Sequence, residues 1–441
     1  MQLNKFTKFE QLKTDLANQF SNIYKQAWQN WLDILLMVIL GILAGIASYK
    51  GAQMIHPFLL ADQAEDIWFG SDLARVLANM VSRTSNNFRT TVHPLFPLFA
   101  YPPMAVLAKL GFHPLVATRI VIATVAGLWL GAIFWLLRLI GCQRFDAIIF
   151  SLLAATSAAA VFWFVVPETY SFGSLSMLLG LCFAVVAQQQ KFSSLWYIAV
   201  SAMTLSITTT NWMVGIIVTF VNNSRKRAVL ITVYALCLVG LLWGVQKLFF
   251  PSAQFFIAQK EEANYILPAT SGGPIRIFQA LISHTIVMPA IKIDKIPGGH
   301  DWLVMFTQMS RPGSATIWGT VAVILWTALL GLGLWGFFST KQHFKFRIIL
   351  GLTLLGQVAL HLVYGDETFL YSLHFVIFFI VLVAFSTLTR ARPLALLLAT
   401  MLVLSAGVNN GSEFERAKSF VESVAPAQYE LPLSIQPEIK K

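Results

Sequence analysis

The sequence predicts an all-α polytopic membrane protein with about eleven transmembrane helices and two sizeable outer loops. Of its 441 residues, 57% are hydrophobic and only 12% are charged. Apolar runs of about 20 residues recur along the chain, and this is the length that a helix needs to cross the hydrocarbon core of a bilayer. Lysine and arginine cluster between alternate runs, and this fixes the orientation because cytoplasmic loops are enriched in these residues.

The N-terminal segment 1–30 precedes every apolar run. From Phe6 to Trp28 its apolar residues recur at steps of three and four, with lysines between them. This pattern predicts an amphipathic helix that lies on the cytoplasmic surface of the membrane. The apolar run that begins at Trp31 is long enough to span the bilayer and to remain there as a signal anchor.

Each predicted span coincides with one apolar run, except for one hairpin. The predicted spans are 31–48, 115–140, 147–166, 171–187, a hairpin within 194–221, 228–245, 316–338, 348–363, 369–386 and 394–408. The hairpin segment is too long for one pass and too short for two full ones, and its polar middle runs from Thr208 to Asn211. Such short passes need protein or water around them at membrane depth. The segment 93–112 is apolar but broken by prolines, so we expect it to lie along the outer interface.

These assignments divide the chain into five parts. They are the interfacial helix 1–30, a membrane module 31–245 with its first outer loop at 49–114, a large outer loop 246–315, C-terminal transmembrane helices 316–408 and an outer polar tail 409–441. The whole net charge of +11 then falls on the cytoplasmic side, while acidic and basic residues balance outside. The N-terminus is predicted inside and the C-terminus outside, and such a compact chain is typical of a bacterial inner membrane.

The three cysteines, Cys142, Cys182 and Cys237, lie in or beside apolar runs. This placement predicts small buried hydrophobic side chains rather than disulfides or metal ligands. We expect no organic cofactor and no nucleic-acid partner.

Ionisable residues beside the predicted spans gather in the outer third of the membrane. An ionisable side chain at the centre of a membrane helix costs roughly 2.5–3.5 kcal/mol, so such residues mark sites or the ends of spans. The residues are Arg119, Glu168, His361, Asp366, Glu367 and His374. If these helix ends converge, they form a polar pocket at the depth of the outer leaflet. The alternative is that each one separately contacts lipid headgroups.

The first outer loop contains the segment 68–80, which predicts a loop followed by a short helix that Ser71 or Asp72 caps. Asp72 and Arg75 are three residues apart and would share one face of this helix. One interpretation is an N-cap with a local ion pair. The other is a carboxylate that takes a proton from an acceptor hydroxyl while the neighbouring cation binds phosphate.

A second group of acids in this loop, Asp62, Glu65 and Asp66, would share one helical face. Their carboxylates could bind a divalent cation through oxygen ligands. A solvated acidic turn is the alternative, and we favour it because the spacing does not specify a coordination geometry.

The order of short motifs in 31–187 resembles the type-C glycosyltransferases, which include protein O-mannosyltransferases and lipid A aminoarabinose transferases. The matching segments are Asp72 to Met80, His93-Pro94-Leu95, Ala117-Thr118-Arg119 and Leu137-Arg138-Leu139-Ile140-Gly141. The usual Asp-Glu pair of the first motif is replaced here by Ser71-Asp72, and the second proline of the Pro-Pro element by Leu95. The first replacement leaves open whether the catalytic acid is Asp72 or one of the acids in 62–66.

The resemblance implies a polyprenyl-phosphate sugar as donor and a lipid, glycan or protein as acceptor on the outer face. Asp72 would act as general base, and Glu168 corresponds in position to a second acid of the family. Arg119 would stabilise the leaving phosphate together with a second basic group. The candidates for that group are Arg75, Arg89, His93 and Lys109.

Two other functions compete with sugar transfer. A transporter or lipid flippase often has interrupted helices, and the break at 208–211 is one. A ligase or polymerase of envelope glycans would use arginine and histidine in the second outer loop. The residues for that chemistry would be Arg276, His284, His300 and Arg311.

Overall fold

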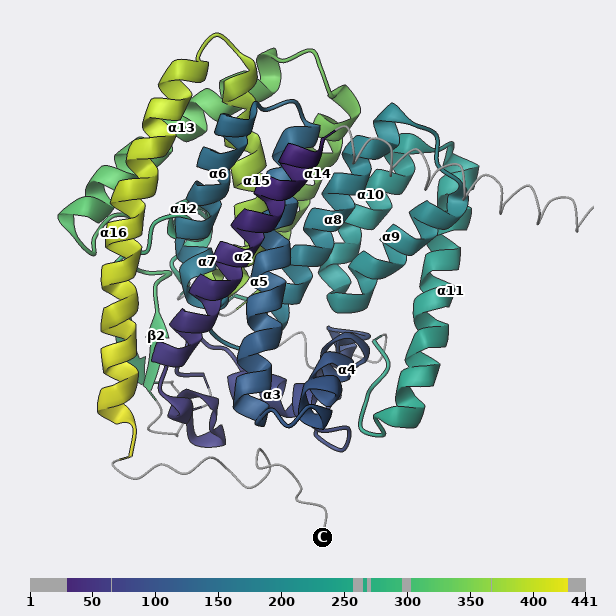
Figure 1. The fold of residues 1–441 in the computed structure, drawn as a ribbon, viewed down its shortest axis with the longest axis vertical. Coiled ribbons are helices and arrows are strands. Elements are labelled where there is room, and N and C mark those ends of the chain that lie inside the picture. The colour runs from purple at the N-terminus through teal and green to yellow at the C-terminus, as the bar shows by residue number, and fades with distance from the viewer. Residues whose placement is uncertain are drawn as a thin grey trace, which may run out of the picture.

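The computed structural model describes residues 30–64, 66–256, 265–267, 271–295, 303–365 and 367–426. Within these ranges the chain is a bundle of helices with one small antiparallel β-hairpin (Figure 1). The predicted interfacial helix apart from Asn30, the candidate residues Glu65, His300 and Asp366, and the end of the predicted tail lie outside the described residues.

In the described ranges, eight helical segments are long and apolar enough to cross a membrane. They are α2 (Trp31–Met54), α5 (Pro114–Leu139), α8 (Thr169–Gln189), α11 (Arg225–Phe249), α13 (Ile317–Ser339), α14 (Phe344–His361), the segment Thr368–Leu388 that contains α15 (Ser372–Ala384), and α16 (Arg392–Val424). The chain is therefore a multi-pass membrane protein.

The remaining predicted passes consist of shorter helices. The segment predicted as one span at 147–166 is divided into α6 (Arg144–Thr156) and α7 (Ala158–Trp163). The predicted hairpin consists of α9 (Ser194–Ile207) and α10 (Trp212–Asn222). Because these helices are too short to count as full spans, the total of about eleven passes stays a prediction.

Ser157 causes the division between α6 and α7. Its extended backbone interrupts the helical path, and its hydroxyl oxygen accepts a hydrogen bond from the Ala160 amide at 3.2 Å. A serine at an N-cap satisfies one of the free amides of the following helix. Short polar residues inside an apolar run can therefore end a helix that hydropathy alone would continue.

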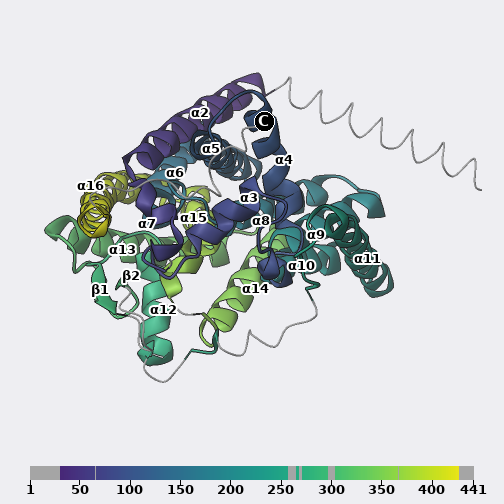
Figure 2. The same ribbon diagram turned by 90° about the horizontal axis from the view of Figure 1, so that it is seen from below.

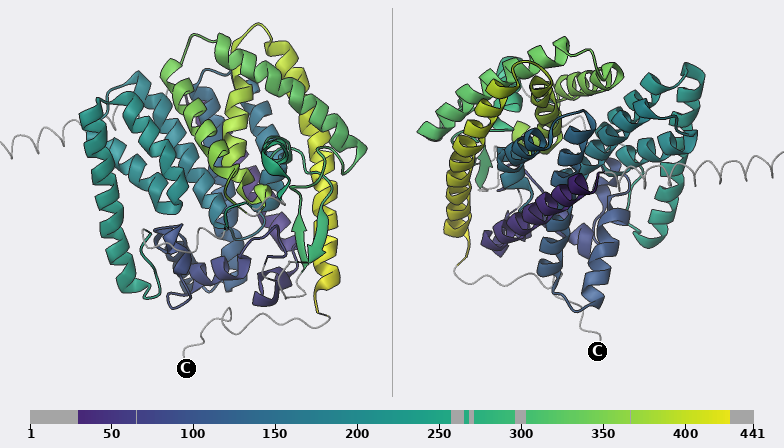
Figure 3. Two further views of the ribbon diagram at one scale, coloured as in Figure 1. Left: turned by 180° about the vertical axis from the view of Figure 1, so that it is seen from behind. Right: turned by 45° about the horizontal axis from the view of Figure 1, so that its top comes forward.

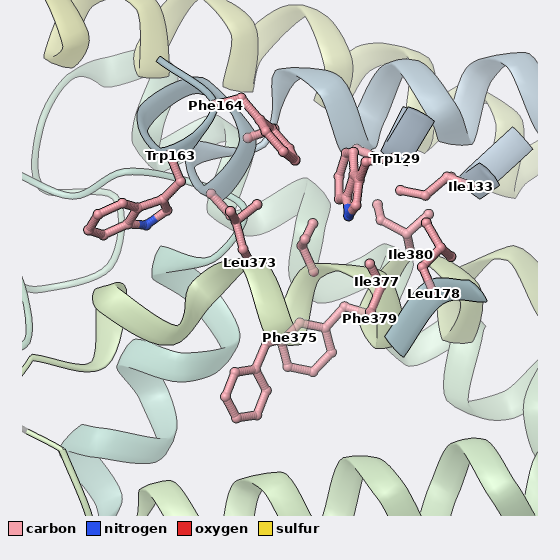
Figure 4. Close-up of a cluster of buried hydrophobic side chains, with 14 of the residues drawn as sticks. Trp129, Ile133, Trp163, Phe164, Leu178, Leu373, Phe375, Ile377, Phe379 and Ile380 are labelled. Carbon is pink, nitrogen blue, oxygen red and sulfur yellow. The ribbon is translucent and has the colours of Figure 1, made fainter. Parts of the chain in front are cut away.

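Helix α15 lies at the centre of the bundle, and every residue from Ser372 to Ala384 is buried. It packs against α6, α8, α13 and α14. Figure 4 shows side chains from its first and middle turns among aromatic and aliphatic residues of α5, α8 and the end of α7. The labelled side chains are Trp129, Ile133, Trp163, Phe164, Leu178, Leu373, Phe375, Ile377, Phe379 and Ile380. Apart from Ser372 and His374 at its start, this helix is apolar on every face, as expected for a helix that is buried all round.

Helices α2 and α5 cross in close contact at two glycines. A Cβ atom on Gly41 would lie 2.9 Å from the Gly127 carbonyl oxygen, and a Cβ on Gly127 would lie 2.7 Å from the Gly41 carbonyl oxygen. Any side chain at either position would push the two backbones apart. Small residues at such crossings let membrane helices approach closely.

We call the end of the bundle that carries α3 (Leu73–Val81) and α4 (Phe96–Lys109) the site end (Figure 2). The first loop also holds the short helices η1 (Pro57–Leu60), η2 (Asp62–Ala64) and η3 (Phe88–Thr91). The second large loop forms α12 (Gly273–His284) and a hairpin of β1 (Lys292–Lys295) and β2 (Leu303–Phe306). Figure 3 shows α11 and α16 at opposite edges of the molecule.

Helix α16 continues beyond Asn409, where we had predicted the start of a polar tail, and ends at Val424. Three of its polar residues, Asn409, Asn410 and Glu413, are buried against the second large loop. The Asn410 side-chain amide donates to the Ile286 carbonyl oxygen at 2.9 Å, and Glu413 is fully buried. These polar side chains satisfy loop backbone groups, which explains why a polar sequence forms a packed helix here.

Ion pairs join helices at the end of the bundle opposite the site end. Asp33 of α2 accepts hydrogen bonds from Arg138 at 3.0 Å and from Arg144 at 2.5 Å. Asp146 of α6 pairs with Arg392 of α16 at 2.8 Å. Both acids are buried, and Asp146 depends on Arg392 as its ion-pair partner, so removing Arg392 would leave a buried charge without compensation.

Candidate functional site

Several helix ends that are far apart in the sequence meet in one polar cavity of about 160 Å³ at the site end. Its lining residues are Arg89, Val92, Tyr170, Thr208, Thr209, Thr210, Leu360, His361, Tyr364, Tyr371 and His374. Two of the predicted pocket residues, His361 and His374, are therefore brought together, although α14 and α15 approach the cavity separately. Arg89 adds a guanidinium group from the first loop.

The break between α9 and α10 forms one wall of this cavity. Thr208 has an extended backbone, and its neighbour Thr209 donates an amide hydrogen bond to the Val92 carbonyl oxygen at 2.9 Å. The Leu95 amide donates to the Ser206 carbonyl oxygen at 2.7 Å. The first loop thus forms hydrogen bonds with the backbone groups that the broken helix leaves free. Such bonds are needed at membrane depth, because the hydrocarbon supplies no water to pair with these groups.

His93 is anchored between this break and the start of α8. Its Nδ1 atom lies 2.9 Å from the Ile207 carbonyl oxygen, and its Nε2 atom lies 3.3 Å from the Thr169 hydroxyl. Burial lowers the pKa of His93 well below its usual value, and the charges of Arg89 and Arg75 lower it further. The imidazole is neutral at physiological pH, and only 3% of the residue is exposed.

Glu168 occupies the N-cap of α8 and is 3% exposed. Its Oε1 atom lies 2.7 Å from both the backbone amide and the hydroxyl of Thr169. Burial raises the pKa of the Glu168 carboxyl, and the negative charge of Asp72 adds to this rise. Hydrogen bonds from Thr169 and the positive charge of Arg75 lower the pKa and so oppose the rise. Glu168 therefore lies within the electrostatic field of the first-loop pair.

Asp72 and Arg75 form the ion pair that their spacing predicts. The Asp72 Oδ2 atom accepts hydrogen bonds from Arg75 Nε at 3.1 Å and from Nη2 at 2.5 Å. Asp72 stands at the N-cap position of α3 but its side chain makes no capping hydrogen bond. The carboxylate is therefore held by the guanidinium, and Ser71 instead donates to the Trp68 carbonyl oxygen at 2.6 Å.

The two guanidinium groups of the first loop lie against the same aromatic ring. The Cζ atoms of Arg75 and Arg89 lie 5.5 Å and 6.0 Å from the centre of the Phe88 ring. Arg89 also lies 5.1 Å from the ring centre of Tyr265, in the second large loop. The Phe88 ring thus links the Asp72–Arg75 ion pair to Arg89, the guanidinium that lines the cavity.

Glu367 does not line the cavity. It caps the short helix η7 (Thr368–Tyr371), and its carboxylate accepts from the backbone amides of Thr307 at 3.1 Å and Gln308 at 3.2 Å. Burial raises the pKa of Glu367, and these hydrogen bonds oppose the rise. The residue thus connects the second large loop to the start of α15 rather than facing a substrate.

The other predicted site residues lie elsewhere. Arg119 lines a narrow crevice with His56 and Pro167, directly before Glu168. Lys109 is exposed at the end of α4, and Asp62 is exposed in η2. Among the described residues no group of three or more histidine, cysteine, aspartate or glutamate side chains could hold a metal ion.

The residues named for the ligase chemistry are also away from the cavity. Arg276 and His284 belong to α12, and neither these residues nor Arg311 line the cavity. Burial lowers the pKa of His284 to about 3, and the charge of Arg276 contributes.

A long apolar groove runs along α5, between α2 and α8. It has a volume of about 970 Å³, and small residues of α5 such as Gly131 and Ala132 line it. Tyr49 and Lys50 line it where α2 reaches the site end. A groove of this kind on a membrane helix is suited to an extended lipid chain, with the cation placed to meet a headgroup.

Sequence reasoning missed the residues that form most of the cavity wall. Tyr170 and Tyr371 follow two acidic N-caps, Glu168 and Glu367, at the starts of helical segments that enter the cavity. The polarity of the threonines at 208–210 predicts a break in the hairpin but not a cavity wall. The sequence does contain a signal for this wall. Polar residues in the middle of a short apolar hairpin must form hydrogen bonds to protein or water at membrane depth.

Comparison with protein-family models, with curated proteins and with solved structures finds no match to this chain. The chemistry of the site therefore rests on its own geometry. The described residues bring together an arginine-held carboxylate, a buried second carboxyl, a neutral histidine and a cavity with a guanidinium at its mouth.

Proposed function

We propose that the protein is a membrane glycosyltransferase that moves a sugar from a polyprenyl-phosphate carrier to an acceptor hydroxyl. The supporting observation is the Asp72–Arg75 pair, whose charges act on buried Glu168 beside a polar cavity that Arg89 borders. A carboxylate and cations within one site are what this transfer needs, since one group accepts a proton and the others stabilise a leaving phosphate.

In this mechanism Asp72 takes the proton of the acceptor hydroxyl as its oxygen attacks the anomeric carbon of the sugar. The bond between that carbon and the phosphate oxygen breaks, and its electron pair leaves with the polyprenyl phosphate. Arg119, toward which the groove leads, acts with Arg75 and Arg89 to stabilise the negative charge on the phosphate. One attack from the face opposite the phosphate inverts the anomeric carbon, so no second nucleophilic carboxylate is required.

His93 has a positioning role in this proposal, although the sequence suggested it as a phosphate ligand. It is buried, its pKa is lowered, and both ring nitrogens lie close to protein atoms. A neutral imidazole offers no charge to a phosphate. Its contacts fix the position of the break at Thr208 relative to the start of α8, and both segments border the cavity.

The apolar groove along α5 supports a lipid-linked donor. A polyprenyl chain in this groove would direct its headgroup toward Lys50 and Arg119 at the site end, where Ile120, the next residue of α5, still lines the groove. By the positive-inside rule the site end is the outer face, and in a bacterial inner membrane this is the periplasmic side.

The test uses the purified full-length protein in lipid nanodiscs with polyprenyl-phosphate hexoses and a mixture of lipid and glycan acceptors. Mass spectrometry follows consumption of the donor and release of the free carrier. We expect turnover by the wild type, loss of turnover in Asp72→Asn, and normal turnover in Asp294→Asn, which alters an exposed acid on β1. If the wild type neither binds nor consumes any such donor, the proposed function is wrong.

A further inference from the structure

The turn 68–71 leads into α3 and has an unusual backbone. Both of its central residues are left-handed, with φ angles of 54° at Phe69 and 72° at Gly70. The Ser71 amide and the Ser71 hydroxyl both donate to the Trp68 carbonyl oxygen, at 3.2 Å and 2.6 Å. Two left-handed residues inside one hydrogen-bonded turn are typical of a type I′ turn, whose central positions favour glycine, asparagine and aspartate. Phenylalanine at such a position is therefore exceptional.

Other aromatic rings hold the ring of Phe69, which is fully buried. Its ring centre lies 4.9 Å from that of Phe369 in η7, and 5.6 Å and 6.1 Å from those of Phe162 and Trp163 in α7. All three contacts are edge-to-face, an arrangement that aromatic pairs favour. This packing offsets the cost of a left-handed backbone at a bulky residue.

The second large loop is also connected to this turn. The Met305 amide in β2 donates to the Ile67 carbonyl oxygen at 3.0 Å, one residue before the turn. Glu367, which accepts hydrogen bonds from the same loop, accepts another from the Phe369 amide at 3.2 Å. The ring of Phe69 therefore contacts a residue whose own backbone is connected to the second large loop.

Asp72 follows this turn directly, and few other contacts fix its position. Among the described residues its carboxylate forms hydrogen bonds with Arg75 alone, and both residues stand in the first turn of α3. Because the two partners move together, their ion pair does not fix the carboxylate relative to the cavity. The buried apolar face of α3 fixes the helix, and the turn 68–71 sets the backbone at its start, where Asp72 stands.

We propose that Phe69 is a positioning residue for Asp72. The inference rests on the proposed function, in which Asp72 is the general base, and adds how the protein holds that base. The buried ring locks a backbone conformation that phenylalanine otherwise avoids, and the turn then presents Asp72 in one orientation. Strained residues that their surroundings hold in place cluster at active sites, where they preorganise reacting groups. A general base has to lie within hydrogen-bond reach of the hydroxyl it deprotonates, so a small shift of the turn slows transfer.

The first test changes the turn without touching the aromatic rings. In Gly70→Ala the added Cβ meets no atom within 4 Å, but alanine disfavours the left-handed backbone. Gly111→Ala, directly after α4, is the matched control, because φ is 86° there and its Cβ also meets no atom within 4 Å. We expect a similar fall in melting temperature for both variants. In the nanodisc assay kcat should fall by about tenfold to a hundredfold in Gly70→Ala alone, with the donor KM unchanged. Equal kcat values for the two variants would overturn the inference.

A second pair of variants tests the ring itself. Phe69→Leu removes the edge-to-face contacts and keeps an apolar side chain. Phe346→Leu is the control, because Phe346 is equally buried but lies near the start of α14, at the end of the bundle opposite the site end. We expect both variants to lose stability and only Phe69→Leu to lose kcat, again with the donor KM unchanged. Equal kcat values in this pair would contradict a positioning role for the ring.

Asparagine at position 70 provides a rescue. Asparagine tolerates a left-handed backbone better than alanine does. We therefore expect Gly70→Asn to keep a higher kcat than Gly70→Ala. An asparagine variant with a kcat no higher than that of the alanine variant would show that the backbone conformation of the turn does not position the base.

Hydrogen exchange separates a failure of this inference from a failure of the proposed function. The amides of Ser71 and Val76 form the hydrogen bonds of the turn and of the start of α3, and their exchange needs no substrate. We expect both amides to exchange faster in Gly70→Ala than in the wild type, and at the wild-type rate in Gly111→Ala. If the wild type consumes no donor, the proposed function is wrong, and the exchange rates still decide whether the turn holds the start of α3. If the wild type is active and the two variants agree in kcat and in exchange, the positioning role is wrong.

Discussion

The Nδ1 atom of His93 lies 2.9 Å from the carbonyl oxygen of Ile207. A carbonyl oxygen can only accept, so Nδ1 carries the hydrogen and Nε2 of the neutral ring is an acceptor. The Thr169 hydroxyl, 3.3 Å from Nε2, is also 2.7 Å from Glu168 Oε1. One hydroxyl hydrogen cannot serve both neighbours, and the Thr169 hydroxyl donates it to Glu168.

The burial of Glu168 predicts that its carboxyl titrates at a higher pH than an ordinary glutamate. Burial raises its pKa above the ordinary value of 4.5. The folded state then binds more protons than the unfolded state between 4.5 and the raised pKa, so the contribution of Glu168 to stability falls as pH rises through this window. Glu168→Gln should remove this component, because glutamine mimics the protonated carboxyl without titrating.

The measurement is the melting temperature of wild type and Glu168→Gln in nanodiscs from pH 5 to 8. The stability of the variant relative to the wild type should increase with pH. The contribution of His93 to stability changes with pH in the opposite direction, because its lowered pKa makes stability rise with pH below 6.5. Both proteins contain His93, so its contribution cancels when the stability of the wild type is subtracted from that of the variant. A difference that does not vary with pH would show that Glu168 is ionised throughout.

A second prediction concerns the proton acceptor of the proposed transfer. Asp72→Asn should lower turnover by about 10²–10⁴-fold, which is the usual contribution of a general base. The donor KM should change little, because Arg75 and Arg89 remain to bind phosphate. Arg75→Lys should instead raise the donor KM, since an ammonium cannot offer a phosphate the paired donors of a guanidinium. The reverse pattern would assign the base role to another acid.

A third prediction concerns Glu367 and the second large loop. Its carboxylate receives the amides of Thr307 and Gln308 and the Thr307 hydroxyl. Glu367→Ala leaves these buried donors unpaired, so we expect a loss of about 1–3 kcal/mol or more in stability. Protease cleavage in the loop should accelerate, whereas Glu415→Gln, at an exposed position of α16, should change neither property. Unchanged cleavage would contradict a connecting role for Glu367.

The membrane class and most helix positions could be predicted because hydropathy reports directly on burial in lipid. The division at Ser157 could not, since it depends on a single hydroxyl that caps the following helix. The packed course of α16 beyond Asn409 was missed for a related reason. Its amides and carboxylate are satisfied by a loop more than a hundred residues earlier, and polarity alone does not show such a partner.

The candidate site could be predicted only where local spacing sets the geometry. Asp72 and Arg75 pair through one helical turn, so their contact is visible in the sequence. The convergence of His361, His374 and the threonines at 208–210 depends on how α14, α15 and the α9–α10 break pack together. The environment of Glu367 was not visible in the sequence either. This acid lies beside a predicted span, but its carboxylate accepts hydrogen bonds from the second large loop.

A fourth prediction tests whether the groove along α5 holds the lipid chain of the donor. Thr124 lines the groove, and its side chain is exposed. Thr124→Trp would fill this space with a large ring, and an extended polyprenyl chain could then no longer lie against α5. Because the residue faces the groove rather than the packed interior, the melting temperature should remain nearly unchanged.

The expected result for Thr124→Trp is a rise of about tenfold or more in the KM for a long-chain donor. A donor with a short, water-soluble prenyl chain should be used as well as by the wild type, since it does not extend into the groove. Leu241→Trp on the exposed face of α11 is the control, because it adds the same ring to a lipid-facing surface outside the groove. If Thr124→Trp and the control behave alike with the long-chain donor, the chain does not lie along α5, and the headgroup contacts of Lys50 and Arg119 lose their basis.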